Sequence, residues 1–498
     1  MAIKIDHQLT PKRLASKIER VLELSAAKIL ALERAWKAEQ GTPVFTVKGR
    51  YTTRGWTEWT QGFQFGSALL QFDATGEERF LELGRRKTVA LMATHVSHTG
   101  VHDHGFNNIS TYGNLLRLMR EGRIPWNERE KDFYELALKV SGAVQAARWT
   151  KLPSGGYIYS FNGPHSLFID TMRSLRSLAV AHQLGHVLMG EQDGRISLLR
   201  RLIQHADTTA KYSVYLGGRR DRYDVRGRVA HESIFNVNDG NYRCPNSQQG
   251  YSPFSTWTRG LAWAILGFAE ELEFFRTLSM DELESAFVTD SFSCALERRP
   301  RQRRLSGVGK LMKTFRGSAK EGMERIHEAA TATADFYLAN SCADGIPMWD
   351  TGAPNLHRLP ADYPSRPADP FNRWEPVDSS AAAIAAQGLI RLGNLLVASG
   401  RSKGAVRYRQ AGLSMAKTIF SEPYLSTNPK HQGLILHSVY HRPNGWDSIA
   451  PGQRVPNGES SMWGDYHALE LALLILREAR GEGYLTFFGC VPPGRACS

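Results

Sequence analysis

Helical periodicity runs through most of this chain and limits its fold more than any other feature. Apolar residues recur at the three-to-four-residue spacing of amphipathic helices, and no convincing series of alternating strands is present. Hairpin turns that combine Gly with a charged residue lead into aromatic-bearing helices, as in "TGEERFLELGRRKTVALM" and "SGRSKGAVRYRQAGLSMA". We expect helices over twelve segments, 11–38, 57–73, 77–97, 107–121, 127–147, 164–185, 194–215, 255–278, 319–340, 379–399, 402–420 and 461–478.

Recurring helical hairpins are typical of architectures that bury their core by stacking neighbours. Twelve helices in six hairpins predict an all-α fold, an (α/α)6 barrel with an inner and an outer layer of helices. Long loops rich in Gly, Pro and Asn interrupt the helices at 216–254 and 341–378, and polar connections of that length are uncommon unless they bind something. We therefore expect one domain, 1–498, decorated by long loops.

Composition indicates a globular protein. Hydrophobic residues make up 42% and charged residues 22% of 498 residues, and no stretch approaches the about 20 consecutive apolar residues that span a bilayer. The first residues, "MAIKIDHQLTPKRLASKIER", lack the apolar core and cleavage site of a signal peptide. We expect a cytoplasmic protein, or a periplasmic one if a signal has been removed. The cysteines are odd in number and form no CxxC pair, so we expect reduced thiols at Cys244, Cys294, Cys342, Cys490 and Cys497.

The net charge of +13 would attract polyanions, but much of it is local. Nine basic residues and no acidic one lie between Arg298 and Lys320, in a basic insertion near 291–320. Such a run is usually a solvated loop. It lacks interleaved aromatic residues on which bases could stack, so we expect neither a nucleic-acid partner nor a membrane. The oligomeric state stays open.

Tryptophans cluster at expected loops and helix starts, among them Trp56 and Trp59 in "RGWTEWTQGF". Indole rings at a barrel mouth would suit the C–H faces of sugars, whereas a single Trp is more often part of the core or rim. The stretch "QQGYSPFSTWTRGLAW" adds Gln249, Arg259 and Trp263, an amide, a guanidinium and an aromatic ring that could grip a carboxylated sugar. Arg259 could equally form a surface ion pair.

Asp170 lies within the apolar run "NGPHSLFIDTMRSLRSLAVA", which we expect to be helical. An unpaired buried carboxylate is costly, so Asp170 either faces a cavity or pairs with a neighbouring Arg. Facing a cavity, it would have a pKa raised by desolvation, as a general acid needs.

A second carboxylate, Asp103, lies among imidazoles in "HTGVHDHGFNNIS". His95, His98 and His102 fall on one face of the expected helix, and Asp103 could complete a metal set. No metal motif such as HExxH is present, so we expect no metal. Two aspartates at a barrel mouth fit acid/base carbohydrate chemistry, because glycoside cleavage usually needs paired carboxylates.

An ordered series of stretches resembles the unsaturated glucuronyl hydrolases, glycoside hydrolase family 88. These stretches are "WTEWTQGF", "HDHGF", "LFIDTMRSL", "HADTT", "QGYSPFSTWTRGLAW", "DGIPMWD", "DSSAAAIAAQGL", "LILHSVYH" and "SMWGDYHALEL". The resemblance implies an (α/α)6 barrel and a hydrolase that removes a Δ4,5-unsaturated uronate from the non-reducing end of lyase-generated oligosaccharides. It implies acid/base hydration of the C4=C5 enol ether with no cofactor. This chain is longer than typical members at 216–248 and near 291–320.

By position, the resemblance implies that Asp170 is the general acid/base and that Asp103 is a second essential aspartate. It implies a substrate site lined by His102, His231, Gln249, Arg259 and Trp263, to which the tryptophan cluster adds Trp59. Arg259 would meet the uronate carboxylate. In "DSSAAAIAA" we expect small side chains at close helix contacts, with Asp378 capping the helix.

Three alternatives stay open at this point. An unsaturated rhamnogalacturonyl hydrolase would share the fold and the chemistry. A saturated β-glucuronidase of the inverting type would use the two aspartates on opposite sides of the bond. A non-catalytic binding protein for acidic polysaccharide would show salt-sensitive affinity that survives loss of Asp170.

Overall fold

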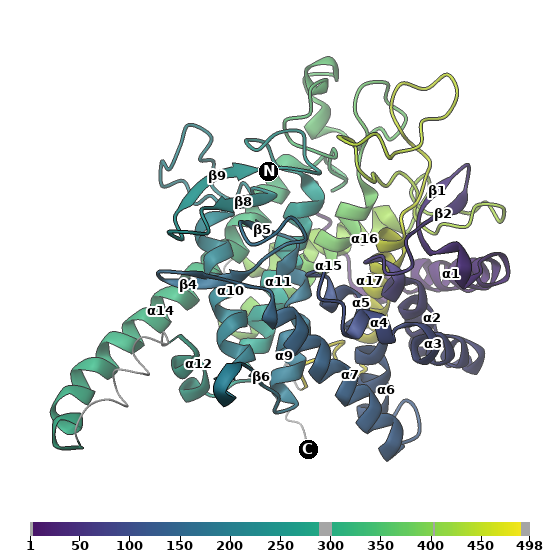
Figure 1. Cartoon of the computed structure of the whole chain (residues 1–498). Coiled ribbons are helices and arrows are strands. Elements are labelled where there is room, and N and C mark those ends of the chain that lie inside the picture. Colours follow the sequence, from purple (N-terminus) through teal and green to yellow (C-terminus); the bar gives the residue numbers. More distant parts are fainter. Residues whose placement is uncertain (1–2, 288–300, 402–403, 490–498) are drawn as a thin grey trace.

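The computed structural model describes residues 3–287, 301–401 and 404–489. Within these ranges, six helical segments form a closed inner ring in which each contacts the next and the last returns to the first (Figure 1). The ring consists of α2 (Gln61–Thr75); α5 (His104–Asn108) with the π-helical turn η3 (Ile109–Gly113) and α6 (Asn114–Arg120); α8 (Thr171–Ser174) with α9 (Arg176–Gln183); α11 (Thr258–Phe275); α15 (Ser379–Ala398); and α17 (Met462–Arg480).

An outer layer of helices packs against this ring, each against a ring helix that adjoins it in sequence. The outer helices are α1 (Ala15–Ala35), α3 (Glu78–Leu91) with α4 (Ala93–Val96), α7 (Glu128–Ala147), α10 (Leu198–Tyr212), α14 (Arg301–Asn340) and α16 (Ala405–Ile419). A shorter helix, α12 (Met280–Phe287), lies against α10 and α14. This is the predicted (α/α)6 barrel.

The inner helices are largely buried because other helices cover both their faces. Every residue of α11 is buried, and α15 approaches it closely through small side chains. A Cβ on Gly388 would lie 2.7 Å from the backbone nitrogen of Leu266. Asp378 caps α15 by accepting hydrogen bonds from the backbone N–H groups of Ser380 and Ala381, so the predicted cap is confirmed. Contrary to our expectation, α15 is long and apolar enough to cross a membrane, but 83% of that stretch is buried, as in the core helix of a barrel.

Short strands decorate the barrel where the sequence predicted only helices and loops. The antiparallel sets are β1 (Thr42–Val47) with β2 (Arg50–Arg54), β3 (Trp149–Leu152) with β4 (Gly155–Ile158), β6 (Leu188–Met189) with β7 (Arg195–Ile196), and a three-stranded sheet of β5 (Ser166–Phe168), β8 (Glu232–Phe235) and β9 (Tyr242–Asn246). The helix predicted over 164–185 therefore begins as a strand. Strands this short carry little periodicity, and β5 is formed by its pairing with β8 about 65 residues later.

The basic segment is helical from Arg301, so the loop predicted over 298–320 is wrong for most of its length. Arg, Lys, Leu and Met are good helix formers, and this stretch continues directly into the part of α14 that packs on α11. Residues 288–300 lie outside the described ranges. So do Cys294, Cys490 and Cys497, whereas Cys244 and Cys342 are free thiols.

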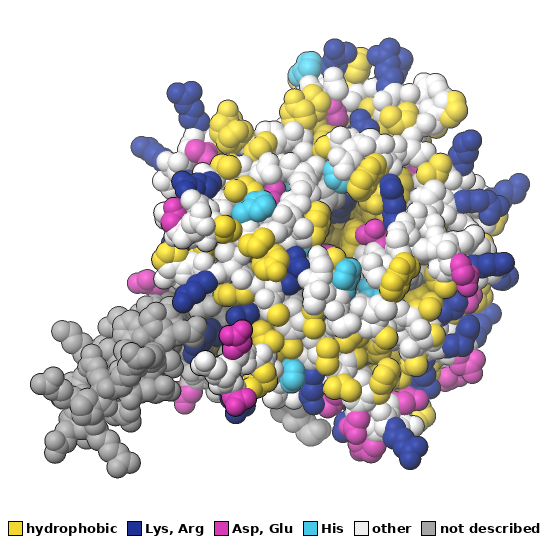
Figure 2. Space-filling model, viewed as in Figure 1, with side chains coloured by type: hydrophobic (Ala, Val, Ile, Leu, Met, Phe, Trp, Pro, Cys, Tyr) yellow, Lys and Arg dark blue, Asp and Glu magenta, His cyan; other side chains and the backbone are white. Residues whose placement is uncertain are grey.

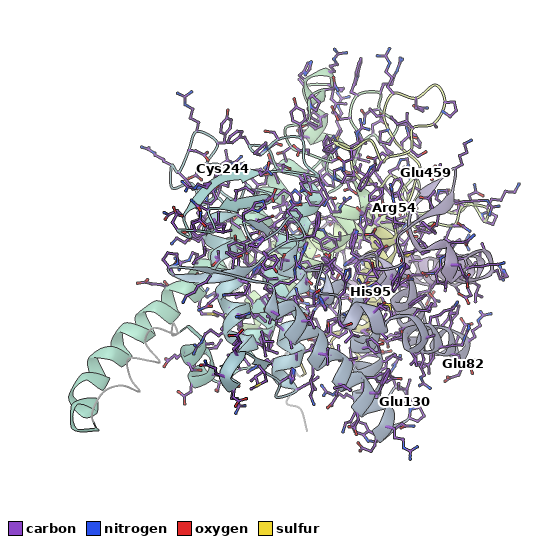
Figure 3. All side chains as sticks on the ribbon, in the orientation of Figure 1. Arg54, Glu82, His95, Glu130, Cys244 and Glu459 are labelled. Carbon is purple, nitrogen blue, oxygen red and sulfur yellow. The ribbon has the colours of Figure 1, made fainter. Side chains whose placement is uncertain are left out.

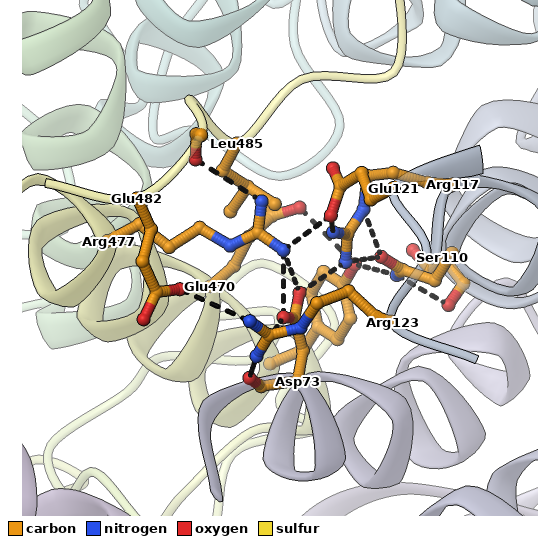
Figure 4. Close-up of polar contacts among 12 residues, drawn as sticks. Asp73, Ser110, Arg117, Glu121, Arg123, Glu470, Arg477, Glu482 and Leu485 are labelled. Atoms are coloured by element: carbon orange, nitrogen blue, oxygen red, sulfur yellow. Dashed lines mark hydrogen bonds and ion pairs between the residues drawn. The ribbon is translucent and has the colours of Figure 1, made fainter. Parts of the chain in front are cut away.

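A buried ion cluster joins three of the inner helices (Figure 4). Asp73 of α2 lies 2.7 Å from Nη2 of Arg117 in α6 and 2.7 Å from Nη2 of Arg477 in α17. Glu121 bridges the same two guanidinium groups. Burial raises the pKa of Asp73, but the two arginines lower it by more, so the net pKa lies below its usual range. Removing one member would leave buried charges unpaired, which is strongly destabilising.

Candidate active site

Asp170 lies where a strand turns into a helix, not within a helix as predicted. It follows β5 and occupies the position before α8, and its side chain forms no cap hydrogen bond. Its Oδ2 atom lies 3.0 Å from Nε2 of His102, so the partner of this buried carboxylate is an imidazole instead of an arginine. The strand pairing of β5 with β8 fixes the backbone that carries Asp170.

Asp103 reaches the same place from the start of α5. Its Oδ1 atom lies 3.7 Å from Nε2 of His102, so the two aspartates flank one imidazole. Gly105 allows this approach, because a Cβ there would lie 2.2 Å from the backbone oxygen of Ser174. The Ser174 hydroxyl donates to the carbonyl oxygen of His102 (2.7 Å) and accepts from the N–H of Gly105 (2.9 Å). Close contact between α5 and α8 therefore builds the site.

The two carboxyl groups have opposite pKa shifts. Burial raises the pKa of Asp103, and the charge of Asp170 adds to the increase. Burial is the largest single influence and raises the pKa of Asp170, but the hydrogen bond and charge of His102, together with the charge of His231, outweigh it and the net pKa is lowered. The raised pKa predicted for Asp170 is therefore wrong for the free protein. The pKa of His102 is raised in spite of burial, because both aspartates favour the imidazolium.

The predicted face of histidines does not form. The helix ends with α4 at Val96, so His98 and His102 lie beyond it on a loop. Among the described residues, the group with metal-ligand spacing is His102, Asp103 and Asp170, whose donor atoms lie within 4.8 Å of one another. These residues could hold a metal ion, but Nε2 of His102 would then have to give up its hydrogen bond to Asp170.

His231 lies beside Asp170, held by the sheet. Its carbonyl oxygen accepts a hydrogen bond from the N–H of Ile169. Its Nδ1 atom accepts from the backbone N–H of Gln248 (3.0 Å) and of Gln249 (3.4 Å), and burial lowers its pKa to about 4. The neutral ring must therefore carry its proton on Nε2, which has no hydrogen-bond partner among the described residues. This buried N–H can donate to a substrate.

Arg259 is saturated by the protein instead of facing the pocket. It is 1% exposed, and its guanidinium lies 4.7 Å from the ring centres of both Trp257 and Trp463. Nη2 donates to Oε1 of Gln249 (2.9 Å) and to the carbonyl oxygen of Tyr440 (2.7 Å). Nη1 donates to the carbonyl oxygen of Val439 and to Asp378. The expected contact between Arg259 and a uronate carboxylate does not fit this arrangement; instead, Arg259 positions Gln249.

Aromatic rings line the wall near Asp103. Trp59 is partly exposed and stacks on Trp463 with ring centres 5.1 Å apart. Trp263 is 2% exposed and packs between Phe106 and His467, so it supports the wall from behind. The face shown in Figure 2 is hollowed right of centre, with hydrophobic, acidic and histidine side chains around the hollow.

Two further residues near the aspartates were not among the predicted site residues. His205, in the "HADTT" stretch, is buried, interacts electrostatically with Asp170, and has its Nδ1 occupied by the N–H of Ile158 (3.0 Å). Its Nε2 has no hydrogen-bond partner among the described residues. Glu58 lies between Trp56 and Trp59 and interacts electrostatically with Asp103. The sequence could have indicated Glu58 as a site residue, because its carboxylate lies between two tryptophans in the chain.

Comparisons with known proteins concern the whole chain. No family model matches the chain. The chain is 25% identical over 449 residues to the unsaturated glucuronyl hydrolase of Bacillus sp. (strain GL1), covering 87% of this chain and 90% of that protein. It is 22% identical over 419 residues to that of Formosa agariphila, covering 83% and 78%. A solved structure of such an enzyme with dGlcA-Glc-Rha-Glc has a TM-score of 0.65 at 21% identity, covering 94% of this chain and 97% of that one. In sequence and in fold, the chain is therefore similar to the unsaturated glucuronyl hydrolases, as its motifs indicated.

Proposed function

We propose that this protein is a glycoside hydrolase that removes the Δ4,5-unsaturated uronate from the non-reducing end of lyase-generated oligosaccharides. The observation that carries the proposal is the pair of buried carboxyl groups, Asp103 and Asp170, on either side of His102. The similarity to unsaturated glucuronyl hydrolases over most of both chains supports the same reaction. The proposed partner is a small acidic oligosaccharide.

The spacing of the two carboxyl groups argues against a saturated glucuronidase of the inverting type. Donor oxygens of Asp103 and Asp170 lie within 4.8 Å of each other. An inverting enzyme needs a separation of about 6.5–9.5 Å to accommodate a water molecule between its carboxyl groups. Hydration of an enol ether has no such need, because the proton and the water add to adjacent carbons of one double bond.

The residues of the site account for the movement of the proton. In the free protein, the proton is favoured on His102, beside an ionised Asp170. Arrival of the uronate carboxylate would raise the pKa of Asp170, because like charges disfavour its ionised form. The proton then passes from Nε2 of His102 to Oδ2 of Asp170 across the 3.0 Å hydrogen bond. His231, through its free Nε2–H, would bind the substrate.

Asp170 then donates the proton to C4, and cationic character develops at C5. Water adds to C5 and gives its proton to the Asp170 carboxylate, which restores the starting state. The C5 hemiketal opens to a ketone at C5 and leaves a hemiacetal at C1. This hemiacetal collapses to an aldehyde, and the remaining sugar leaves as its alcohol. Asp103, whose pKa is raised by burial, would remain protonated over a wider pH range and would orient substrate hydroxyls or Asp170.

The experiment that tests this function follows the ultraviolet absorbance of the conjugated double bond. Unsaturated disaccharides from chondroitin, hyaluronan, heparin, gellan, ulvan and pectin would be incubated with wild type and with Asp170→Asn, with and without a metal chelator. We expect wild type to remove the absorbance of at least one substrate with the chelator present, and Asp170→Asn to be slower by about a hundred- to ten-thousandfold. Constant absorbance across the panel with wild type would refute the proposal. Release of glucuronic acid from a saturated glucuronide, assayed alongside the panel, would instead favour a glucuronidase.

We further propose a cytoplasmic location. The free thiols of Cys244, which is exposed, and Cys342, which is buried, suit a reducing compartment. Fractionation of the native host, with the absorbance assay applied to each fraction, would test this; activity confined to the periplasm or medium would contradict it.

A further inference from the structure

Arg54 is a cation at the edge of the hollow seen in Figure 2, where Figure 3 labels it at the end of β2. Its guanidinium carbon lies 4.7 Å from the ring centre of Trp446 and 5.6 Å from that of Tyr440. These rings belong to a loop almost 400 residues later in the chain and contact each other with centres 5.3 Å apart. The guanidinium is held in place by this stacking and by a side-chain hydrogen bond with Tyr440, while its remaining in-plane N–H groups can meet a ligand.

Arg54 forms no ion pair with any residue that the structure describes. The arginines deeper in the site differ in this respect. Arg259 donates to Gln249, Asp378 and two carbonyl oxygens, and Arg148 donates to the carbonyl oxygens of Thr99, Tyr159 and Ser160. Arg54 is also exposed, whereas those two are buried. Among these arginines, Arg54 has the guanidinium that an incoming anion can reach.

Glu58 connects Arg54 to the reacting centre. Burial raises the pKa of Glu58, the charge of Asp103 raises it further, and the charge of Arg54 lowers it. Three ionisable groups thus interact in turn, from the buried Asp103, through the half-buried Glu58, to the exposed Arg54. A sugar attached to a uronate bound at Asp103 must extend towards solvent. Trp446, which is 43% exposed, offers it an apolar face.

We propose that Arg54, with Trp446 beside it, forms the subsite for the sugar next to the unsaturated uronate and selects an anionic substituent on that sugar. The inference rests on the proposed function and adds a specificity residue to it. A sulfate ester and a carboxylate share the chemistry that a guanidinium binds in bidentate fashion. Glu58 opposes the same anion by charge repulsion, so the two side chains set the preference together.

The test measures a ratio of kcat/KM values by the absorbance assay. The substrates are an unsaturated chondroitin disaccharide with a sulfate ester on its hexosamine, the same disaccharide without sulfate, and an unsaturated disaccharide of two uronates. The variants are Arg54→Gln, Arg54→Lys, Glu58→Gln and, as matched control, Arg50→Gln. Arg50 is exposed at the other end of β2 and forms no ion pair among the described residues.

We expect Arg54→Gln to lower the ratio of anionic to unsulfated substrate about tenfold, which is the size of one charge-assisted hydrogen bond. Arg54→Lys should retain part of the ratio, Glu58→Gln should increase it, and Arg50→Gln should leave it unchanged. High salt should shrink the effect of Arg54. The anionic substrate with the larger dependence on Arg54 identifies the group bound. Equal ratios for wild type and Arg54→Gln, with wild type active, would overturn this inference alone; wild type inactive on all substrates would overturn the proposed function with it.

Discussion

Replacing Arg259 with Met distinguishes two possible roles for this residue. Loss of an arginine that holds the structure together lowers stability, whereas loss of an arginine that binds substrate raises KM. The guanidinium joins Asp378, Gln249 and the chain segment at Val439 and Tyr440. Met would keep the apolar packing between two tryptophans but would remove every one of these hydrogen bonds.

The expected loss of stability follows from those contacts. Asp378 is fully buried and would lose its opposite charge, although three backbone N–H groups still bind its carboxylate. Two carbonyl oxygens and Oε1 of Gln249 would lose their donor, at about 1 kcal/mol for each one left unsatisfied. Breaking one side of a buried ion pair costs about 3–5 kcal/mol. We expect Arg259→Met to lower the free energy of unfolding by at least about 3–5 kcal/mol.

Urea unfolding followed by circular dichroism would measure this loss, with Arg50→Met as an exposed control expected to change stability by less than about 0.5 kcal/mol. Steady-state kinetics on an unsaturated disaccharide would be run on the same samples. A stable Arg259→Met variant whose only defect is a raised KM would refute the scaffold role, and it would restore Arg259 as the residue that meets the uronate carboxylate.

Two further predictions concern the assembly of the site and of the barrel. Gly105→Ala should lower kcat by about a hundredfold, because the new methyl group would lie 2.2 Å from the Ser174 oxygen and displace Asp103, whereas Gly483→Ala, with open space around it, should not; equal kcat values would contradict this. Asp73 has a lowered pKa in the folded protein, so its stabilising contribution is present above its unfolded pKa of about 4 and is lost as the pH falls through the folded value. Thermal unfolding between pH 7 and 3 should therefore show a steeper acid decline for wild type than for Asp73→Asn, which should already be less stable at pH 7; parallel curves would contradict this.

The sequence located the helices well where their packing is periodic. The predicted segments 127–147, 255–278 and 379–399 agree with α7, α11 and α15 to within a few residues at each end. The spacing of apolar residues within each segment is enough to predict the helix. The cap at Asp378 is equally local. The break after Val96 was missed. The strand before Asp170 was missed because it forms by pairing with β8, which is distant in the sequence.

The electrostatic predictions show the same division. The apolar neighbours of Asp170 predicted a raised pKa, and burial does act in that direction. His102, from 68 residues earlier, and His231 together act to lower it, and the net pKa is lowered. Arg259 was expected to be available to a ligand, but its four acceptors come from three separate segments of the chain. Arg54 was not predicted to be a site residue, because the loop that carries Trp446, against which it packs, is almost 400 residues away in the sequence.

The sequence by itself therefore determined the helical class of this protein, the order of its hairpins and the residue types from which a carboxylate site can be built. Those features depend on interactions within a few helical turns. The tertiary structure alone decided which carboxylate is flanked by which imidazole, which arginine is saturated and which is free. Desolvation and charge pairing act over a few ångströms in space, and the closing of the barrel is what brings residues hundreds of positions apart to that distance.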